Sequence, residues 1–486
     1  MGNVHKWLPF WYRKIADGKF VIVSQSGNHL IVDTNSIQKI IDNCVDEESD
    51  LFFRLKNRQI IASRDDFKLQ VELTANQLRT RKSFLNDFTS LHIIVVTCKC
   101  NFCCRYCHAS SSSMDVKNGD MKWETAKKTV DMIFASPSDN IKIEFQGGEP
   151  LIQWNLIKDI VEYAEIVNRF SKKHLEFVIC SNLTLMTKEI GDYCKEHHIC
   201  ISTSLDGDKN IQNSNRIMRD GNDGYELFMQ GYEIAKNHVG ADACSPLLTV
   251  TKDNLSSLPY VIDHYIKMNF NGVFIRELNP YGNAEKNKSL VGYSTDEFVH
   301  YYKSALNYII ARNLSGVYFG EYYATLLLRR ILTPFATGFV DLQSPCGDII
   351  GAAVYDYDGN VYASDEGRML ARMGDRQFLL GNVLRDSWEQ IFKSEKVKEI
   401  VKASCVEALP TCAFCAYQLY CGASPVRYYT ESGNYFGNRA SSNFCKKTKG
   451  VIDYLFYLLD TDSDDVLDTF WSWLTNRSLE ELRLNV

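Results

Sequence analysis

Residues 86–335 alternate short β-rich segments with longer helical patterns, and this alternation limits the possible folds more than any other feature of the chain. Apolar, β-branched runs separated by amphipathic stretches are typical of repeated βαβ units with a parallel sheet. The predicted strands cover residues 91–97, 141–146, 176–180, 199–204, 246–251 and 272–277. Six such units predict an α/β fold with a partial (β/α)6 barrel, whose functional residues are expected at the C-terminal ends of the strands.

Length and charge exclude several classes of protein. A chain of 486 residues is longer than a single hydrophobic core usually supports, so two or three domains are expected. The net charge of -6 argues against a nucleic acid as the main partner. There is no signal-peptide pattern and no apolar run of about 18 residues, so we expect a cytoplasmic protein that does not enter a membrane.

Three cysteines follow the first predicted strand of the barrel. Cys100, Cys104 and Cys107 have the spacing Cys-x3-Cys-x2-Cys. Three thiolates on one short loop can hold three irons of a [4Fe–4S] cluster and leave the fourth iron open. A zinc site, with Cys104 and Cys107 as a Cys-x2-Cys knuckle, is the alternative, as is a group of reduced cysteines without metal.

The cysteine loop resembles that of the radical S-adenosylmethionine (SAM) superfamily. The spacing is the family spacing, and Tyr106 supplies the aromatic residue that the family has before the third cysteine. The resemblance implies a [4Fe–4S] cluster on this loop and SAM as the second cofactor. It further implies that SAM is cleaved reductively, giving a 5′-deoxyadenosyl radical that removes a hydrogen atom from the substrate.

Two further motifs match SAM contacts of this superfamily. Gly147, Gly148 and Glu149 end the second predicted strand, where glycines allow close approach to the backbone and a carboxylate accepts hydrogen bonds from an ammonium group. By resemblance they would bind the methionine amino group. Ser204 and Arg216 would hold the SAM carboxylate, since a guanidinium binds a carboxylate with two parallel hydrogen bonds. The alternative for Arg216 is an ordinary surface salt bridge.

A second cysteine group lies near the C-terminus. Cys412, Cys415, Cys421 and Cys445 resemble one ligand set of the SPASM domain, which carries auxiliary clusters in peptide-modifying and protein-modifying radical SAM enzymes. The resemblance implies one auxiliary [4Fe–4S] cluster with four protein ligands. A zinc ribbon is the alternative for these four cysteines.

The other SPASM ligand set is incomplete. Cys346 is present, but Ser364 and Pro425 stand where the family has cysteines, so we predict one auxiliary cluster rather than two. Cys405 is unassigned. The residue after Ser364 is Asp365, which matches a general base proposed for anaerobic sulfatase-maturing enzymes. A solvated turn is the alternative reading of Asp365.

The flanking segments predict smaller units. Residues 19–23 and 29–32 form a predicted hairpin that helices at 35–44 and 49–57 follow, which fits a winged-helix-like module. Such a module would dock a leader peptide as an added strand, or simply cap the barrel. The expected units are an N-terminal module (1–85), the radical SAM barrel (86–335), a SPASM-like domain (336–448) and a helical tail (449–486).

The overall layout most resembles the radical SAM maturases of His-Xaa-Ser peptide systems. The resemblance implies an enzyme that crosslinks, epimerises or oxidises a ribosomally synthesised precursor peptide. Its implied partners are that peptide, a second radical SAM maturase, and a reductant protein such as flavodoxin or ferredoxin. The alternatives are a sulfatase-type maturase that forms formylglycine, and a non-enzymatic, zinc-stabilised protein that binds peptides.

Overall fold

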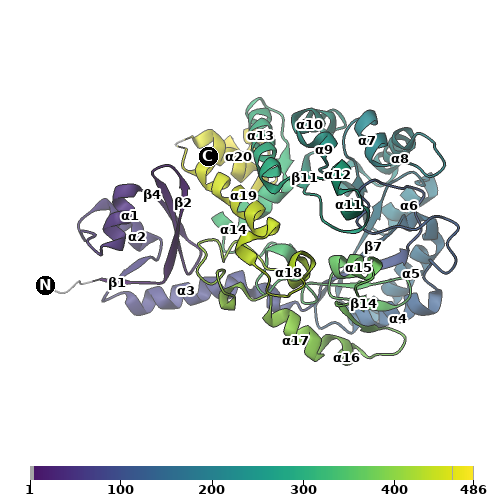
Figure 1. Ribbon diagram of the computed structural model, residues 1–486, viewed down its shortest axis with the longest axis horizontal. Coiled ribbons are helices and arrows are strands. Elements are labelled where there is room, and N and C mark those ends of the chain that lie inside the picture. The colour runs from purple at the N-terminus through teal and green to yellow at the C-terminus, as the bar shows by residue number, and fades with distance from the viewer. Residues whose placement is uncertain (1–4, 462, 485–486) are drawn as a thin grey trace.

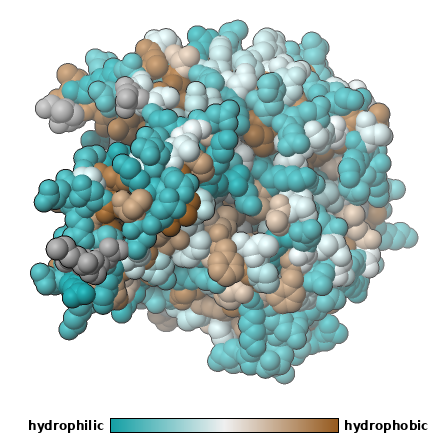
Figure 2. All heavy atoms as spheres, turned by 60° about the vertical axis from the view of Figure 1, so that its left-hand side comes forward, coloured by the Kyte–Doolittle hydropathy of each residue, from teal (hydrophilic) through white to brown (hydrophobic). Residues whose placement is uncertain are grey.

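The computed structural model describes residues 5–461 and 463–484. The outermost residues of the expected N-terminal module and helical tail, 1–4 and 485–486, lie outside the described residues. The ribbon has a small unit at the N-terminal end and a sheet surrounded by helices at the other end, with C-terminal helices between them (Figure 1). Hydrophilic side chains cover most of the face that bears the small unit, and hydrophobic ones form separate patches (Figure 2).

The N-terminal unit contains the predicted hairpin and both predicted helices, all of which are confirmed. Its elements are β1 (His5–Trp7), β2 (Phe10–Ala16), β3 (Lys19–Ser24), β4 (His29–Asp33), α1 (Thr34–Ile41), α2 (Asp50–Asn57), β5 (Ile61–Ser63) and α3 (Phe67–Arg81). Strand β2, which the sequence did not reveal, extends the antiparallel hairpin to a three-stranded sheet. Buried side chains such as Ile22, Leu30 and Phe52 give the unit a core of its own.

The N-terminal unit is attached to the rest of the chain by polar contacts that cross long stretches of sequence. Arg13 pairs with Asp453 of a C-terminal helix at 2.7 Å. The buried guanidinium of Arg81 donates to the carbonyl oxygen of Arg330 at 2.8 Å. The partners of both arginines lie outside the small unit, so these tertiary contacts fix its position relative to the barrel.

All six predicted barrel strands are confirmed and lie parallel to their neighbours in chain order. They are β6 (Leu91–Thr97), β7 (Asn140–Gly147), β8 (His174–Ser181), β9 (Ile199–Ser204), β10 (Cys244–Thr249) and β11 (Gly272–Arg276). The helices between and after them are α4 (Trp123–Phe134), α5 (Trp154–Ser171), α6 (Lys188–Glu196), α7 (Lys209–Asn215), α8 (Gly224–His238), α9 (Lys252–Leu255), α10 (Leu258–Lys267), α11 (Gly282–Lys286), α12 (Lys288–Val291), α13 (Thr295–Leu314) and α14 (Tyr322–Leu332). The α/β fold with a partial barrel is therefore confirmed.

The sheet does not end with these six strands. Its order is β12-β11-β10-β9-β8-β7-β6-β13-β14-β15, in which β12 (Gly320–Glu321) is a short edge strand. Strand β13 (Ala352–Tyr355) pairs in parallel with β6, and β14 (Asn360–Tyr362) and β15 (Leu379–Asn382) follow it in antiparallel pairs. The expected border at residue 336 therefore falls within one continuous sheet.

The C-terminal region is mostly helical. Its helices are α15 (Asp365–Arg372), α16 (Trp388–Phe392), α17 (Glu395–Lys402), α18 (Pro425–Ser432), α19 (Asn443–Leu459), α20 (Asp464–Thr475) and α21 (Leu479–Arg483). Helix α19 contacts α13 of the barrel and β2 of the N-terminal unit, so it joins the two ends of the molecule (Figure 1). Phe470 and Trp473 are buried packing residues. Among the described residues, no helix has both the length and the apolar composition needed to cross a membrane.

Candidate cluster and cofactor site

The first cysteine group lies directly after β6, at the C-terminal end of the sheet. Cys100 is 7% exposed, and Cys104 and Cys107 are partly buried. Burial, then the charge of Glu149 and to a smaller extent that of Cys107, raise the pKa of Cys100 to about 12. The pKa of Cys104 is raised by burial and by both other thiols. The other two thiols thus lie close enough to Cys104 to act on it, as a cluster with three protein ligands requires.

A buried polar set stands beside these cysteines. The Tyr106 hydroxyl donates to Asp206 Oδ2 at 2.6 Å. Arg216 donates to both oxygens of Asp206, from Nε at 3.1 Å and from Nη2 at 3.3 Å, and its guanidinium lies 5.3 Å from the centre of the Tyr106 ring. Arg216 therefore already holds a carboxylate of the chain itself. Three of its five N–H groups remain for a ligand.

Asp206 is a site residue that sequence reasoning missed, because an Asp-Gly pair after a strand looks like an ordinary turn. It is completely buried. Ser204, two residues earlier at the end of β9, is partly exposed, and its hydroxyl makes no hydrogen bond within the described chain. The prediction that Ser204 and Arg216 hold the SAM carboxylate stays a prediction, and Asp206 is the residue that orients Arg216.

The two glycines at the end of β7, Gly147 and Gly148, make room for the backbone of the cysteine loop. A Cβ atom on Gly147 would lie 2.1 Å from the carbonyl oxygen of Thr97, and one on Gly148 would lie 2.0 Å from that of Lys99. The Gly148 N–H donates to Thr97 O at 2.9 Å. The glycines are thus required because the backbone of the cysteine loop lies against them, whatever a cofactor adds.

The Glu149 carboxylate is also occupied by the chain. It is 1% exposed and accepts hydrogen bonds from the Leu151 N–H, the Ser181 hydroxyl and the Asn182 N–H at 2.8–3.0 Å. Burial raises the pKa of Glu149 to about 7, and these three donors oppose that rise. Its observed function is to tie the end of β7 to the end of β8. Binding of a methionine ammonium group by residues 147–149 stays a prediction.

The four C-terminal cysteines line one pocket. Cys412, Cys415 and Cys421 come from the loop before α18, and Cys445 comes from the first turn of α19. Burial raises the pKa of Cys421, as does the charge of each of the other three thiols. All sixteen cysteines of the chain are free thiols. The structure therefore brings together the set predicted from the sequence.

Arg439 faces the same pocket. It is 4% exposed, and its Nη2 donates to the carbonyl oxygens of Ala403 and Tyr435 at 2.7 Å and 3.0 Å. Its Nε and Nη1 are buried without a hydrogen-bond partner among the described residues. A buried guanidinium with free donors suits an anionic ligand, and an iron–sulfur cluster with four thiolates provides sulfur acceptors and negative charge.

The zinc alternative for the four C-terminal cysteines stays open. Zinc binds four ligands at one centre, with Zn–S distances of about 2.3 Å, whereas in a cluster each cysteine binds a different iron. Among residues 5–461 and 463–484, no three His, Cys, Asp or Glu side chains are arranged to hold a single metal ion.

The residues at the positions of the incomplete SPASM ligand set make other contacts. Ser364 Oγ accepts from the Gly367 N–H at 3.2 Å and caps helix α15. Pro425 begins α18, and the buried Cys346 donates to the Val340 carbonyl oxygen at 3.3 Å. Cys405 is not on the lining of the cysteine pocket. These contacts agree with the prediction of a single auxiliary site.

A cavity of about 390 Å³, here called the barrel cavity, lies between the barrel strands and residues 340–366. Asp365 is on its lining and pairs with Arg368 Nη2 at 2.8 Å. The charge of Cys107 acts on Arg368, which links this cavity to the cysteine loop. The proposed role of Asp365 as a base stays a prediction, and Arg368 is the partner that the sequence did not reveal.

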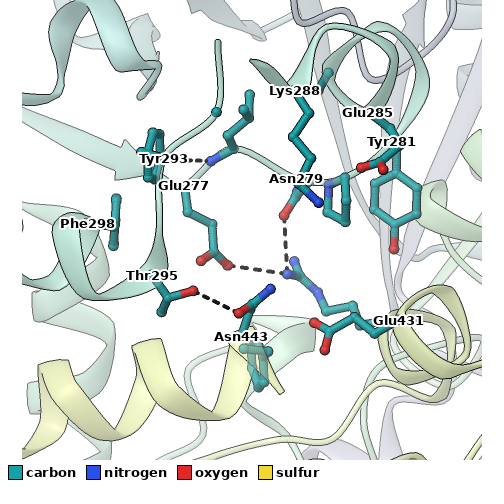
Figure 3. Close-up of a pocket in the computed structure, with 16 residues that line it drawn as sticks. Glu277, Asn279, Tyr281, Glu285, Lys288, Tyr293, Thr295, Phe298, Glu431 and Asn443 are labelled. Carbon is teal, nitrogen blue, oxygen red and sulfur yellow. Dashed lines mark hydrogen bonds and ion pairs between the residues drawn. The ribbon is translucent and has the colours of Figure 1, made fainter. Parts of the chain in front are cut away.

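A smaller space of about 120 Å³, here called the loop pocket, adjoins the barrel cavity. Figure 3 shows Glu277, Asn279, Lys288 and Tyr293 around it, with Asn443 contributed by α19. The two spaces share five lining residues, which are Glu277, Asn279, Phe298, Arg427 and Phe444. Arg427 and its partners thus stand between them.

Comparison with known proteins agrees with this geometry. Residues 94–264 match the family model described as Radical SAM superfamily. The radical SAM cyclopropyl synthase TigE of Paramaledivibacter caminithermalis is 28% identical over 158 residues, which are 30% of this chain and 32% of TigE. A cysteine-type anaerobic sulfatase-maturating enzyme of Clostridium perfringens is 24% identical over 328 residues, 65% of this chain and 83% of that enzyme. The chain spans about a third to a half of the length of the curated relatives that it matches most strongly.

A solved structure has the same fold. Native anSMEcpe with bound AdoMet and Cp18Cys peptide matches with a TM-score of 0.63 at 19% identity, covering 76% of this chain and 97% of that one. At this identity the likeness concerns the fold. The family match, the six parallel strands and the three-cysteine loop together identify residues 94–264 as a radical SAM domain.

Proposed function

We propose that this protein is a radical SAM enzyme that modifies a ribosomally synthesised peptide. The observation that carries the proposal is the loop with Cys100, Cys104 and Cys107 beside the buried Arg216–Asp206 pair, at the C-terminal ends of the barrel strands. When bound, the cluster and SAM supply a 5′-deoxyadenosyl radical that removes a hydrogen atom from the substrate.

The residues of the chain hold and shield these groups. The three thiolates bind three irons and leave one iron open for SAM. Asp206 fixes the guanidinium of Arg216, which with the Ser204 hydroxyl binds the SAM carboxylate. Residues 147–149 receive the amino group, and Tyr106 closes the site from one side. The barrel cavity next to them accommodates the substrate residue away from bulk water.

The second cysteine group serves electron transfer. Cys412, Cys415, Cys421 and Cys445 supply a ligand for every iron of one auxiliary [4Fe–4S] cluster, so this cluster has no open position. A substrate radical must lose an electron to give an oxidised product or a crosslink, and a cluster held by these four cysteines would supply an acceptor for that electron.

Relatives and the fold support a peptide substrate. TigE is named as a cyclopropyl synthase, and the solved anSMEcpe structure contains a bound peptide. Strands β2 and β4 form the edges of the small N-terminal sheet, and a leader peptide would add to such an edge by backbone hydrogen bonds. The proposed partners are this precursor peptide, a second radical SAM maturase and a reductant protein such as flavodoxin or ferredoxin.

A sulfatase-type maturase is the second candidate. The similarity to the Clostridium perfringens enzyme covers 65% of the chain, and Asp365 lies on the lining of the barrel cavity as a base would. The loss of two cysteine ligands at Ser364 and Pro425 weighs against it. Oxidation of a cysteine-containing sulfatase peptide to a product with a free aldehyde would favour this candidate over the first.

The first experiment measures iron, sulfide and zinc after anaerobic reconstitution, together with reductive cleavage of SAM to 5′-deoxyadenosine. We expect about eight irons in the wild type and about four in a Cys100→Ala/Cys104→Ala/Cys107→Ala variant, which forms no 5′-deoxyadenosine. A Cys44→Ala/Cys200→Ala variant, which changes two exposed thiols, is the matched control and behaves like the wild type. Zinc without SAM cleavage would overturn the proposed function.

A further inference from the structure

The barrel cavity contains more carboxylates than cationic groups. The acidic side chains on its lining are Glu144, Glu277, Asp341, Asp348, Asp365 and Glu366. The cationic side chains on its lining are Arg276, Arg427 and Lys447. Arg368 pairs with Asp365 from behind the lining, which brings the cations to four. Six carboxyl groups thus share four cationic side chains.

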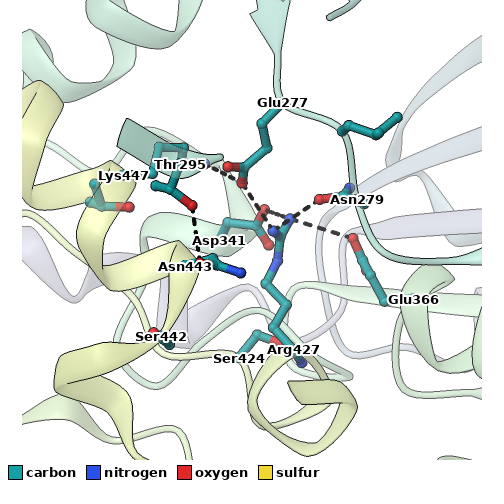
Figure 4. Close-up of polar contacts among 12 residues, drawn as sticks. Glu277, Asn279, Thr295, Asp341, Glu366, Ser424, Arg427, Ser442, Asn443 and Lys447 are labelled. Atoms are coloured by element: carbon teal, nitrogen blue, oxygen red, sulfur yellow. Dashed lines mark hydrogen bonds and ion pairs between the residues drawn. The ribbon is translucent and has the colours of Figure 1, made fainter. Parts of the chain in front are cut away.

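Ion pairs account for four of the six carboxylates. Arg427 Nη2 lies 2.9 Å from Asp341 and 3.6 Å from Glu366, and its Nη1 lies 3.5 Å from Glu277 (Figure 4). Lys447 Nζ lies 2.6 Å from Glu277. Asp365 is the fourth, through Arg368. The pairs of Arg427 and Lys447 form one network through Glu277, at the border between the barrel cavity and the loop pocket.

Glu144 and Asp348 have only neutral partners. Glu144 Oε1 accepts from Gln146 Nε2 at 2.6 Å and from the Cys180 thiol at 3.1 Å. Asp348 is 5% exposed and accepts from the Ser424 hydroxyl at 2.7 Å. Burial raises the pKa of Asp348 to about 7. A buried carboxylate without a cation is costly to keep ionised, so Asp348 favours a cation that enters the cavity, and the partly buried Glu144 adds a second carboxylate without an ion pair.

The rest of the lining suits the stem of a long side chain. Leu247, Phe274 and Phe339 are apolar walls of the same cavity. Lysine and arginine side chains pack their methylene groups on apolar surface and place the charged head among polar groups. The cavity also offers two unpaired donors for a peptide carbonyl. They are the buried Nε of Arg427 and the guanidinium of Arg276, which makes no ion pair within the described ranges.

We propose that the barrel cavity receives a cationic side chain of the substrate peptide, with its charged head between the carboxylates and its stem on the apolar walls. The inference rests on the proposed function, in that the substrate is a peptide. Glu144 lies on β7, Glu277 directly follows β11, and the other carboxylates lie in residues 341–366. The proposed SAM contacts are at residues 147–149, 204 and 216, and Gly147 ends the same strand β7, so the cavity adjoins them. The cavity thus selects the residue that the enzyme modifies, or its immediate neighbour.

The test compares two probes that differ by one charge. N-acetyl-lysine methylamide and N-acetyl-norleucine methylamide are titrated into the reconstituted wild type in the presence of SAM, and binding is measured by calorimetry or ligand-observed NMR. We expect the lysine amide to bind at least about tenfold more tightly, since one charge-assisted hydrogen bond contributes about 1.5 kcal/mol or more. Equal affinities, or no measurable binding of the lysine amide, would overturn the inference.

Variants locate the binding site. Asp348→Asn and Glu366→Gln, which keep size and remove charge, are each expected to weaken the lysine amide about fivefold or more and to leave the norleucine amide unchanged. Glu189→Gln on α6 is the matched control, because Glu189 is an exposed carboxylate whose side chain is 78% accessible. Unchanged lysine affinity in a folded Asp348→Asn protein, checked by its thermal melting, would contradict the proposed location.

This test and the test of the proposed function fail separately. A wild type that forms 5′-deoxyadenosine but binds both amides equally overturns the cation site alone. A protein that contains zinc and does not cleave SAM overturns the proposed function, whether or not the lysine amide binds.

Discussion

The two cysteine groups differ in how they are built and in which residues surround them. Cys100, Cys104 and Cys107 lie on one loop that starts at the end of β6. Cys412, Cys415 and Cys421 lie on a loop between helices, and a helix that starts at residue 443 supplies Cys445. A [4Fe–4S] cluster held by the three thiols of the first group would have one open iron, whereas one held by the four thiols of the second would have none.

The arginines near the two groups also differ. Arg216 donates two of its five N–H groups to Asp206 and keeps three for a ligand. Arg439 lines the four-cysteine pocket and has a buried Nε and Nη1 without hydrogen-bond partners among the described residues. Under the proposed function, the first group binds SAM and the second holds a cluster without an open iron.

Replacing one cysteine of each group tests the difference between the two groups, and we expect the largest effect here. Cys104→Ala should lose about four irons and all measurable 5′-deoxyadenosine formation. Cys421→Ala should also lose about four irons but keep SAM cleavage within about threefold, because the SAM cluster keeps its ligands. Iron content and product chromatography measure both. Loss of SAM cleavage in a Cys421→Ala protein that keeps four irons would show that the groups are not independent.

Asp206→Asn tests the proposed SAM site beside the three-cysteine loop. Removal of one partner from a buried ion pair leaves Arg216 uncompensated, so we expect about 3 kcal/mol lower stability and about tenfold weaker SAM binding. Chemical denaturation and equilibrium dialysis with SAM measure the two effects. Asp465→Asn, which removes an exposed pair with Arg483, is the control and should change neither. Unaltered SAM affinity in Asp206→Asn would remove the role assigned to Arg216.

The carboxylates between the two cysteine groups make stability depend on pH. Burial raises the pKa of Asp348 to about 7, and the carboxylates of Glu366 and Asp341 raise it while Arg427 and the Ser424 hydroxyl lower it. A raised carboxyl pKa means that the folded state binds the proton more tightly. The free energy of unfolding should therefore fall as pH rises from about 4 to about 7, and level off above that.

Asp348→Asn removes this dependence. Relative to the variant, the wild type should lose about 2 kcal/mol between pH 5 and pH 7, measured by denaturant titration. Asp17→Asn, at a fully exposed carboxylate, serves as the control and should keep the slope of the wild type. A wild type whose stability rises over this range would show that Asp348 is ionised and paired in the folded protein.

Arg439→Gln tests the pocket of the four C-terminal cysteines, and we expect the smallest effect here. Loss of one charge-assisted donor, about 1.5 kcal/mol, should lower the reduction potential of the auxiliary cluster by about 60 mV. Potentiometric titration followed by electron paramagnetic resonance measures this, and Arg439→Lys should restore part of the shift. The potential of the SAM cluster should stay unchanged, and an equal shift in both would contradict the assignment of Arg439 to one pocket.

Much of the molecule was predictable because its signals are local. The six barrel strands, the hairpin at 19–33 and both cysteine groups follow from apolar runs, turn residues and cysteine spacing. Strand β2 was not predicted because its sequence, with arginine and lysine among aromatic residues, has no clear alternation of apolar and polar residues. The continuation of the sheet beyond residue 336 was not predicted because β13 pairs with β6, which is far away in sequence.

The sequence by itself determined the barrel, the three-cysteine loop and the four-cysteine set, because hydrophobic period and ligand spacing act over short stretches of chain. Only the tertiary structure decided that Asp206 takes Arg216, that Gly147 and Gly148 make room for the cysteine loop, and that carboxylates of the barrel cavity outnumber its cations. Those features depend on which buried groups face one another across elements distant in sequence, and no local pattern encodes that pairing.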